Sequence, residues 1–193
     1  MERAVFLDRD GVLTRPLVRE GRPYAPRALE EFELLPGVRE ALITLVVAGF
    51  RRVVVTNQPD VAAGTLKPVV LEEMHRRLRG WLPLDAIKVC CHREEDHCAC
   101  RKPKPGLLLD AARELSLDLP GSFMVGDRWR DVSAGKAAGC QTVFIDWGYQ
   151  EELREPSDRT VKTLAQACEI IVSQRTGVDS VGGNVTLCNS SRT

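Results

Sequence analysis

Short apolar runs that end abruptly in polar residues constrain the fold of this chain more than any other feature. Residues 4–7 lead directly into Asp8-Arg9-Asp10-Gly11, and the β-branched run 52–56 continues into Asn57-Gln58. A third run, 122–125, is followed by Gly126-Asp127. Strands buried on both faces of a parallel sheet have this composition, and they place polar side chains at their carboxyl ends. The pattern therefore predicts a buried parallel sheet.

Segments with helical periodicity alternate with these runs. The predicted helices cover 37–48, 68–81, 106–117, 130–138 and 160–173, and further strands are predicted at 86–91 and 141–145. Such alternation indicates an α/β fold, a Rossmann-like three-layer sandwich with a central parallel sheet. The length of 193 residues and a hydrophobic content of 44% suit a single domain, which we place at residues 1–175. Residues 12–35 lack periodicity and are expected to form a small flap, and residues 176–193 a disordered tail.

The charge balance favours a small-molecule partner. The chain has 27 acidic and 27 basic residues and no long basic run, so we expect neither a nucleic acid nor a membrane as a partner. The N-terminus reaches charged residues after only four apolar ones, which is too short for the core of a signal peptide. We therefore expect a cytoplasmic protein, and we expect it to be a monomer.

Acidic side chains follow two of the predicted strands. Asp8 and Asp10 follow the first strand, and Asp127 and Asp131 follow the run at 122–125. Because parallel strands share one crevice at their carboxyl ends, these carboxylates should converge, and converging carboxylates repel unless a cation lies among them. Mg²⁺ fits, since it binds through one or two carboxylates, waters and a substrate phosphate. For any single Asp, a helix cap or turn is the more common role, but the repetition at several strand ends argues against it here.

A second cluster combines cysteine and histidine. Four of the seven cysteines lie within residues 90–100, and Cys90-x-His92 followed by Cys98-x-Cys100 supplies the ligand set of a closed tetrahedral Zn²⁺ site. Four protein ligands leave no open position, so the zinc would be structural. Cys91 and His97 are adjacent alternatives as ligands. The other cysteines, Cys140, Cys168 and Cys188, are not assigned to a site.

The motifs occur in an order that resembles the haloacid dehalogenase-like phosphatases. They are Phe6-Leu-Asp8-Arg-Asp10-Gly-Val12, Val-Val-Thr56-Asn57-Gln58, Arg101-Lys102-Pro103 and Val-Gly126-Asp127-Arg128-Trp-Arg-Asp131. More narrowly, the Asp-Arg-Asp-Gly opening and Cys-x-Cys-Arg-Lys-Pro-x-Pro-Gly are similar to D-glycero-D-manno-heptose 1,7-bisphosphate phosphatases and their relatives, the histidinol-phosphate phosphatases. The resemblance covers roughly residues 4–148.

The resemblance implies a mechanism with a covalent aspartyl-phosphate intermediate. Asp8 would attack phosphorus, and Asp10 would act as general acid and then general base. Thr56 and Lys102 would hold the phosphoryl oxygens. Asp127 would bind Mg²⁺ together with Asp8 and the backbone carbonyl of Asp10. Asp131 would lie behind these groups and orient Lys102 or metal-bound waters.

The resemblance also implies substrate contacts, from Arg9, Asn57, Gln58, Arg101 and Arg128. Guanidinium groups match phosphate, so Arg101 and Arg128 are candidates to hold a second anionic group of the substrate. The zinc loop at 90–100 would order the chain that delivers Arg101 and Lys102. One departure from the family pattern is Ala63, which stands where members commonly have a basic residue.

Three functions are compatible with these residues. The first is a Mg²⁺-dependent phosphomonoesterase that removes one phosphate from D-glycero-D-manno-heptose 1,7-bisphosphate. The second is a phosphatase for histidinol phosphate or another small sugar phosphate, which the loops at 12–35 and 59–66 would select. The third, from a different class, is a catalytically inert binding module stapled by zinc, and the complete set of catalytic residues argues against it.

Overall fold

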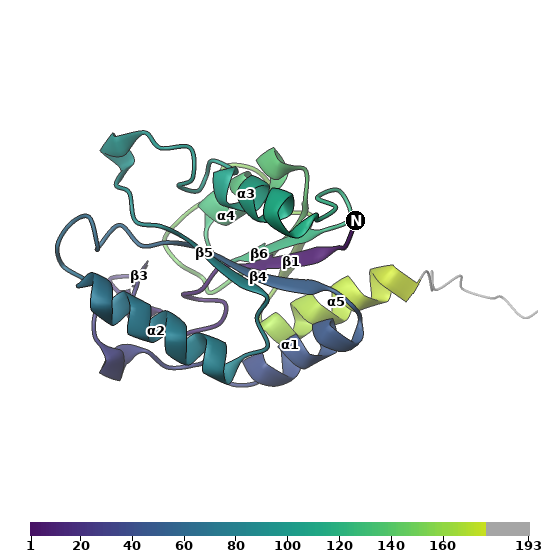
Figure 1. The fold of residues 1–193 in the computed structure, drawn as a ribbon, viewed down its shortest axis with the longest axis horizontal. Coiled ribbons are helices and arrows are strands. Elements are labelled where there is room, and N and C mark those ends of the chain that lie inside the picture. The colour runs from purple at the N-terminus through teal and green to yellow at the C-terminus, as the bar shows by residue number, and fades with distance from the viewer. Residues whose placement is uncertain (177–193) are drawn as a thin grey trace, which may run out of the picture.

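A six-stranded parallel sheet forms the centre of the computed structural model, which describes residues 1–176 (Figure 1). The strands are β1 (Ala4–Leu7), β4 (Arg51–Asn57), β5 (Ala86–Cys90), β6 (Phe123–Gly126), β7 (Gln141–Ile145) and β8 (Arg159–Val161). Their order in the sheet is β5-β4-β1-β6-β7-β8. The carboxyl ends of β1, β4 and β6, which carry the predicted polar residues, therefore lie next to one another at the middle of the sheet.

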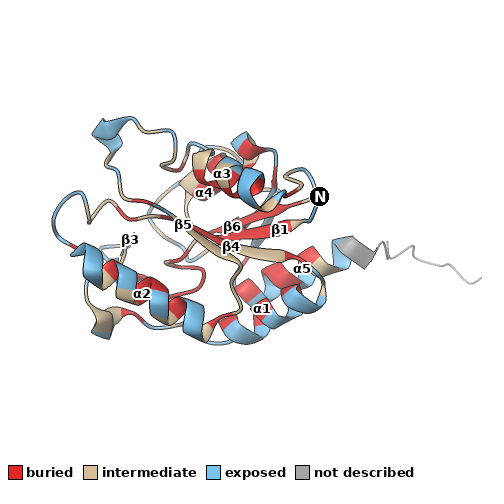
Figure 2. Cartoon of the chain, in the orientation of Figure 1, coloured by how far each residue is buried: buried red, intermediate tan, exposed pale blue. Residues whose placement is uncertain are grey.

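Helices cover both faces of the sheet (Figure 1). One face packs against α1 (Val38–Val47), α2 (Pro68–Trp81) and α5 (Leu164–Thr176), and the other against α3 (Gly106–Leu115) and α4 (Trp129–Ala138). Alternate side chains of β1 divide between the two cores: Val5 and Leu7 join the first, whereas Ala4 and Phe6 join the second. Figure 2 shows both layers buried where they meet the sheet and exposed outside. The predicted three-layer α/β sandwich is confirmed.

The last helix begins later than predicted. The sequence pattern suggested a helix over 160–173, but residues 159–161 instead form β8 at the edge of the sheet, where Val161 pairs with Ile145 and is buried. The hydroxyl of Thr163 accepts a hydrogen bond from the backbone N–H of Gln166 at 3.2 Å, as an N-cap does. The helix therefore starts at Leu164. This helix also ends three residues later than predicted, at Thr176, and the remaining predicted boundaries differ from the observed ones by two residues at most.

The flap contains more structure than its sequence suggested. Within the segment 12–35, β2 (Leu17–Arg19) and β3 (Arg22–Tyr24) form an antiparallel hairpin, and a short 3₁₀ helix, η1, follows at Leu29–Glu31. The hairpin turn is only Glu20-Gly21, with φ of 49° and 71°. Tight hairpin turns need positive φ at both central residues, and Asn-Gly is their usual sequence signal, so Glu-Gly does not indicate one.

The described part of the chain ends with α5. The tail expected at 176–193 lies outside the described residues except for Thr176, the last residue of α5. Within residues 1–176, no helix has both the length and the apolar character needed to cross a membrane.

Candidate active site and metal centres

A pocket of about 350 Å³ opens at the carboxyl ends of β1, β4 and β6. Strands β1 and β4 are hydrogen-bonded neighbours in the sheet, as are β1 and β6, so residues 119 positions apart in the sequence face one space. The predicted residues that line it are Asp8, Asp10, Thr56, Asn57, Arg101, Lys102, Asp127, Arg128 and Asp131. Residues not predicted that also line it are Pro16, Pro23, Tyr24, Ala25, Arg27, Pro59, Asp60 and Arg130.

Lys102 lies at the floor of this pocket, between two carboxylates. Its Nζ is 3.0 Å from Asp8 Oδ1 and 2.6 Å from Asp131 Oδ1, and it donates a hydrogen bond to the carbonyl of Val55 at 2.8 Å. The lysine is 1% exposed. Burial alone would lower the pKa of Lys102, but Asp131 and Asp8 outweigh that effect and raise it, so the ammonium group stays charged. The predicted partnership of Lys102 with Asp131 is thus present in the geometry.

Asp127 has two buried oxygens without a hydrogen-bond partner. Carboxylate oxygens of Asp8, Asp127 and Asp131 lie within 4.8 Å of one another. Burial, followed by repulsion from Asp8 and Asp131, raises the pKa of Asp127 well above its ordinary value. Burial is also the main reason that the pKa of Asp8 rises to about 6. Buried carboxylates normally find partners, so an orphaned one among like charges fits a site for a hard cation such as Mg²⁺.

Two glycines make this cluster possible. A Cβ atom on Gly11 would lie 1.9 Å from Asp127 Oδ2, and a Cβ on Gly126 would lie 2.1 Å from the Cβ of Asp131. Gly11 also has a φ of 88°, which side chains rarely adopt. Because Gly11 and Gly126 have no side chain, Asp127 can approach the backbone at Gly11 and Asp131 can approach the backbone at Gly126.

Asp10 is held by more donors than the sequence suggested. Arg9 Nε and Nη2 donate to Asp10 Oδ1 and Oδ2 at 3.0 and 2.8 Å, Gln58 Nε2 donates to Oδ2 at 2.9 Å, and Thr14 donates to Oδ1 at 3.0 Å. Arg9 and Gln58 are both fully buried and neither lines the pocket. We expected both side chains to contact substrate. Both side chains instead contact the carboxylate of Asp10 and are absent from the pocket lining.

Thr56 and Asn57 stay at the pocket wall. Thr56 accepts a hydrogen bond from Gln58 Nε2 at 2.9 Å, which leaves its hydroxyl proton free to point elsewhere. Asn57 forms two hydrogen bonds with the backbone of Lys102, donating to the carbonyl at 3.0 Å and accepting from the N–H at 3.1 Å. Asn57 thereby fixes the loop that carries Lys102 against β4.

Three arginines form a basic rim on one side of the pocket. Arg101 and Arg128 were predicted, whereas Arg130 was not. Arg128 pairs with Glu151, with Nη2 donating to Oε1 at 2.8 Å. Arg101 donates to the carbonyl of His92 at 3.2 Å. Arg130 lies within two residues of Arg128 in the same motif, which is the only sequence signal that could have indicated it.

Another part of the pocket wall is built by the flap and the loop after β4. Arg27 of the flap donates to Asp60 at 2.8 Å, and Arg93 of the zinc loop donates to the carbonyl of Ala62 at 2.8 Å. Tyr24, at the end of β3, lines the mouth. These contacts connect segments distant in sequence, so no local pattern indicated them.

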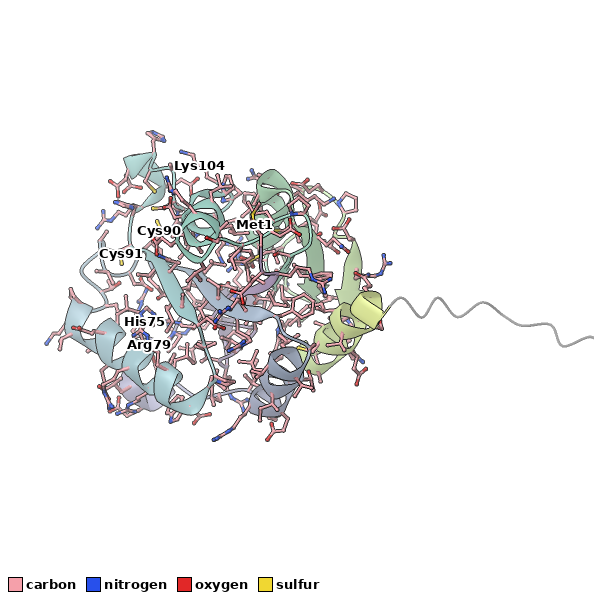
Figure 3. All side chains as sticks on the ribbon, turned by 45° about the vertical axis from the view of Figure 1, so that its right-hand side comes forward. Met1, His75, Arg79, Cys90, Cys91 and Lys104 are labelled. Atoms are coloured by element: carbon pink, nitrogen blue, oxygen red, sulfur yellow. The ribbon has the colours of Figure 1, made fainter. Side chains whose placement is uncertain are left out.

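The predicted zinc ligands converge at the loop after β5. Cys90, His92, Cys98 and Cys100 place their ligand atoms within 4.8 Å of one another, whereas Cys91 and His97 lie outside the group. The sulfur atoms of Cys90, Cys98 and Cys100 are 3.2 to 3.7 Å apart. A tetrahedral site with Zn–S bonds of about 2.3 Å separates its sulfurs by about 3.8 Å, so the donor set fits Zn²⁺. Cys90 lies at the end of β5 (Figure 3).

Comparison with known proteins assigns this arrangement to a class. A family model described as HAD-hyrolase-like matches residues 99–167. The crystal structure of D,D-heptose 1.7-bisphosphate phosphatase from B. bronchiseptica, complexed with magnesium and phosphate, superposes with a TM-score of 0.76 at 33% identity and covers 89% of this chain and 99% of that one. The chain is a haloacid dehalogenase-like phosphatase, and its chemistry is the hydrolysis of phosphoric monoesters.

Curated relatives narrow the class to one family. A D-glycero-beta-D-manno-heptose-1,7-bisphosphate 7-phosphatase from Photorhabdus laumondii is 39% identical over 158 residues, which cover 74% of this chain and 79% of the relative. Its counterpart from Pasteurella multocida is 34% identical over 189 residues, covering 89% and 97%. The chain belongs to the D-glycero-beta-D-manno-heptose-1,7-bisphosphate 7-phosphatase family, as its motifs indicated.

Proposed function

We propose that this protein removes one phosphate from a heptose 1,7-bisphosphate through a covalent acyl phosphate on Asp8. One observation carries the proposal: the two orphaned oxygens of Asp127 lie beside Asp8 and the buried Lys102, in a pocket with a basic rim. This arrangement offers a nucleophile, a site for a cation and a positive charge in one place. Transfer of a phosphoryl group requires a nucleophile to attack phosphorus and positive charge to stabilise the phosphoryl oxygens.

The carboxylates of Asp8 and Asp127, with the backbone carbonyl of Asp10, would hold Mg²⁺. When bound, the ion would offset the charge of the phosphoryl oxygens and of the carboxylates around it. The B. bronchiseptica relative was crystallised with magnesium and phosphate, which supports this choice of metal. Asp131 is already engaged by Lys102 and by the backbone N–H of Arg128, at 2.6 and 3.0 Å, so we assign it the orientation of Lys102.

The reaction follows from the side chains around the nucleophile. An oxygen of Asp8 attacks phosphorus, the bond from phosphorus to the sugar oxygen breaks, and Asp10 delivers a proton to the departing alkoxide. Asp10 then takes a proton from the water that attacks the phosphorus of the acyl phosphate, which releases inorganic phosphate and restores Asp8. Lys102 and the hydroxyl of Thr56 stabilise the phosphoryl oxygens in both steps.

The rim supports a substrate with a second anionic group. Arg101 and Arg128 line the wall of the pocket, and we propose that they bind the phosphate that is retained. Both arginines already face carboxylates: Arg128 pairs with Glu151, and Arg101 lies 3.4 Å from Glu94. A phosphate can therefore replace or share these carboxylate partners at little desolvation cost.

Zn²⁺ would have a structural role. The last of its four ligands, Cys100, directly precedes Arg101 and Lys102, so ordering this loop places both residues.

We further propose that residues 1–175 act as one catalytic domain, as a monomer in the cytoplasm.

A substrate panel tests the proposal. Phosphate release with Mg²⁺ is measured on heptose 1,7-bisphosphate, a heptose monophosphate, histidinol phosphate and ribose 5-phosphate. We expect kcat/KM for the bisphosphate to exceed that for each monophosphate by at least about tenfold, since one good charge-assisted contact is worth that much. A preference for histidinol phosphate would assign the chain to the alternative function. A chain that binds zinc but hydrolyses none of these esters would be a binding module.

A further inference from the structure

His75 is a buried histidine that the proposed chemistry does not use. It lies on α2, one turn before Arg79 (Figure 3), and is 7% exposed. Its Nε2 lies 3.3 Å from Nη1 of Arg9. A guanidinium group can only donate hydrogen bonds, so this contact requires a neutral His75 that accepts at Nε2 and carries its proton on Nδ1.

The guanidinium group of Arg9 contacts both His75 and Asp10. Its Nε and Nη2, which form one edge of the guanidinium, meet the two oxygens of Asp10, and Nη1 on the other side meets His75. The ring of Phe32 packs against the guanidinium at 5.3 Å from Cζ. With no exposed surface, Arg9 has one fixed position, and that position orients the plane of the Asp10 carboxylate.

We infer that Arg9 and His75 are positioning residues for Asp10, with His75 holding Arg9 and Arg9 holding the carboxyl group that protonates the leaving group. The inference rests on the proposed function, in which Asp10 is the general acid. It replaces the expectation that Arg9 binds substrate.

The chemistry of the leaving group distinguishes this role from a general structural one. A sugar alkoxide is a poor leaving group and needs the proton from Asp10, whereas p-nitrophenolate leaves without protonation. The parameter kcat/KM reports only the steps up to transfer of the phosphoryl group to Asp8, before Asp10 acts as general base. Misplacing Asp10 should therefore lower kcat/KM for the sugar phosphate much more than for p-nitrophenyl phosphate. A defect in folding, zinc binding or phosphoryl contacts would slow both substrates alike.

The test compares His75→Leu with His75→Gln on heptose 1,7-bisphosphate and p-nitrophenyl phosphate. Leucine removes the acceptor, and we expect kcat/KM on the sugar phosphate to fall at least about tenfold, with less than about threefold loss on the aryl ester. Glutamine places an acceptor oxygen close to the position of Nε2 and should restore most of the loss. Equal losses on both esters, no loss on either, or no recovery with glutamine would overturn the inference.

A second measurement does not depend on activity. The chain has three histidines, and the ¹⁵N shifts of His75 are assigned by comparison with His75→Gln. We expect the neutral tautomer with the proton on Nδ1 at pH 7, and we expect Arg9→Met to change it. A proton on Nε2 would contradict the contact itself. If wild type cleaves no phosphate ester, the proposed function fails while the tautomer still decides whether His75 holds Arg9.

Discussion

The ammonium nitrogen of Lys102 lies 2.6 Å from a carboxylate oxygen of Asp131, and this ion pair is shorter than the one it makes with Asp8. Asp131 is 1% exposed and caps α4 through its other oxygen, which accepts from the N–H of Arg128. Asp131 thus links the N-terminus of α4 to the ammonium group of Lys102, which in turn faces the nucleophile Asp8.

Replacing Asp131 by Asn tests this connection. Asn keeps the shape and its carbonyl can still cap α4, but the negative charge that holds Lys102 is lost. We expect kcat to fall by about tenfold to a hundredfold, which is typical when a group that orients a catalytic residue is removed. Steady-state kinetics with Mg²⁺ measure it. Asp110→Asn makes the same change at a half-exposed position on α3, outside the pocket, and should leave kcat unchanged. An unaltered kcat in Asp131→Asn would contradict the assignment.

Removing a zinc ligand should abolish zinc binding and lower the stability of the fold. Purified protein should contain one zinc per chain, and Cys100→Ser should contain none and melt at least about 5 °C lower, because a structural site contributes directly to folding. Metal analysis and thermal unfolding measure both quantities. Cys91→Ser and His97→Ala serve as controls, since both residues lie outside the cluster. Loss of zinc in either control, or full zinc in Cys100→Ser, would contradict the ligand set.

The contact between Arg27 and Asp60 should affect substrate binding more than stability. The two side chains are 48% and 20% exposed, and ion pairs of this kind contribute about 0 to 1 kcal/mol to folding. Arg27→Ala should therefore lower the free energy of unfolding by less than about 1 kcal/mol but raise KM several-fold, because the residue lines the pocket. Urea unfolding and initial rates measure these effects. A KM equal to that of wild type would show that Arg27 does not contribute to substrate binding.

His75 should make the fold sensitive to mild acid. Burial, followed by the charges of Arg9 and Arg79, lowers the pKa of His75 from 6.5 to about 4. Between these values the unfolded chain binds a proton that folded His75 does not, so stability falls as the pH drops below 6.5 and is unaffected well above it. The loss should be about 1 to 2 kcal/mol at pH 5.

Urea unfolding of wild type and His75→Gln at pH 7 and pH 5 measures this contribution. Other groups titrate alike in both proteins, so the variant should lose less stability than wild type between the two pH values. Equal losses would show that His75 does not contribute.

The sequence predicted the parts of the site that depend on strand ends. Asp8, Thr56 and Asp127 could be located because each follows a buried apolar run, and strands that end at one edge bring their polar residues together. Spacing alone does not give the direction of a side chain in an irregular turn. Arg9 sits between two site aspartates in the sequence and yet turns into the core, where His75 of α2 receives it.

Elements with weak local signals were the ones missed. Strand β8 has only three residues, Arg159–Val161, and exists because β7 offers an unpaired edge. The flap hairpin turns at Glu20-Gly21, where positive φ values are set by the pairing of β2 and β3. Arg27 and Asp60 meet across 33 residues. All three depend on tertiary contacts that a periodicity in the sequence does not contain.

The most direct test of the account is to trap the phosphate on Asp8. Enzyme is mixed with ³²P-labelled heptose 1,7-bisphosphate and Mg²⁺, quenched in acid within milliseconds, and treated with borohydride, which reduces an aspartyl phosphate to homoserine. We predict label on the quenched protein and homoserine at position 8 by mass spectrometry, with neither in Asp8→Asn. Turnover of the substrate without homoserine at position 8, or label that persists in Asp8→Asn, would contradict the covalent role of Asp8.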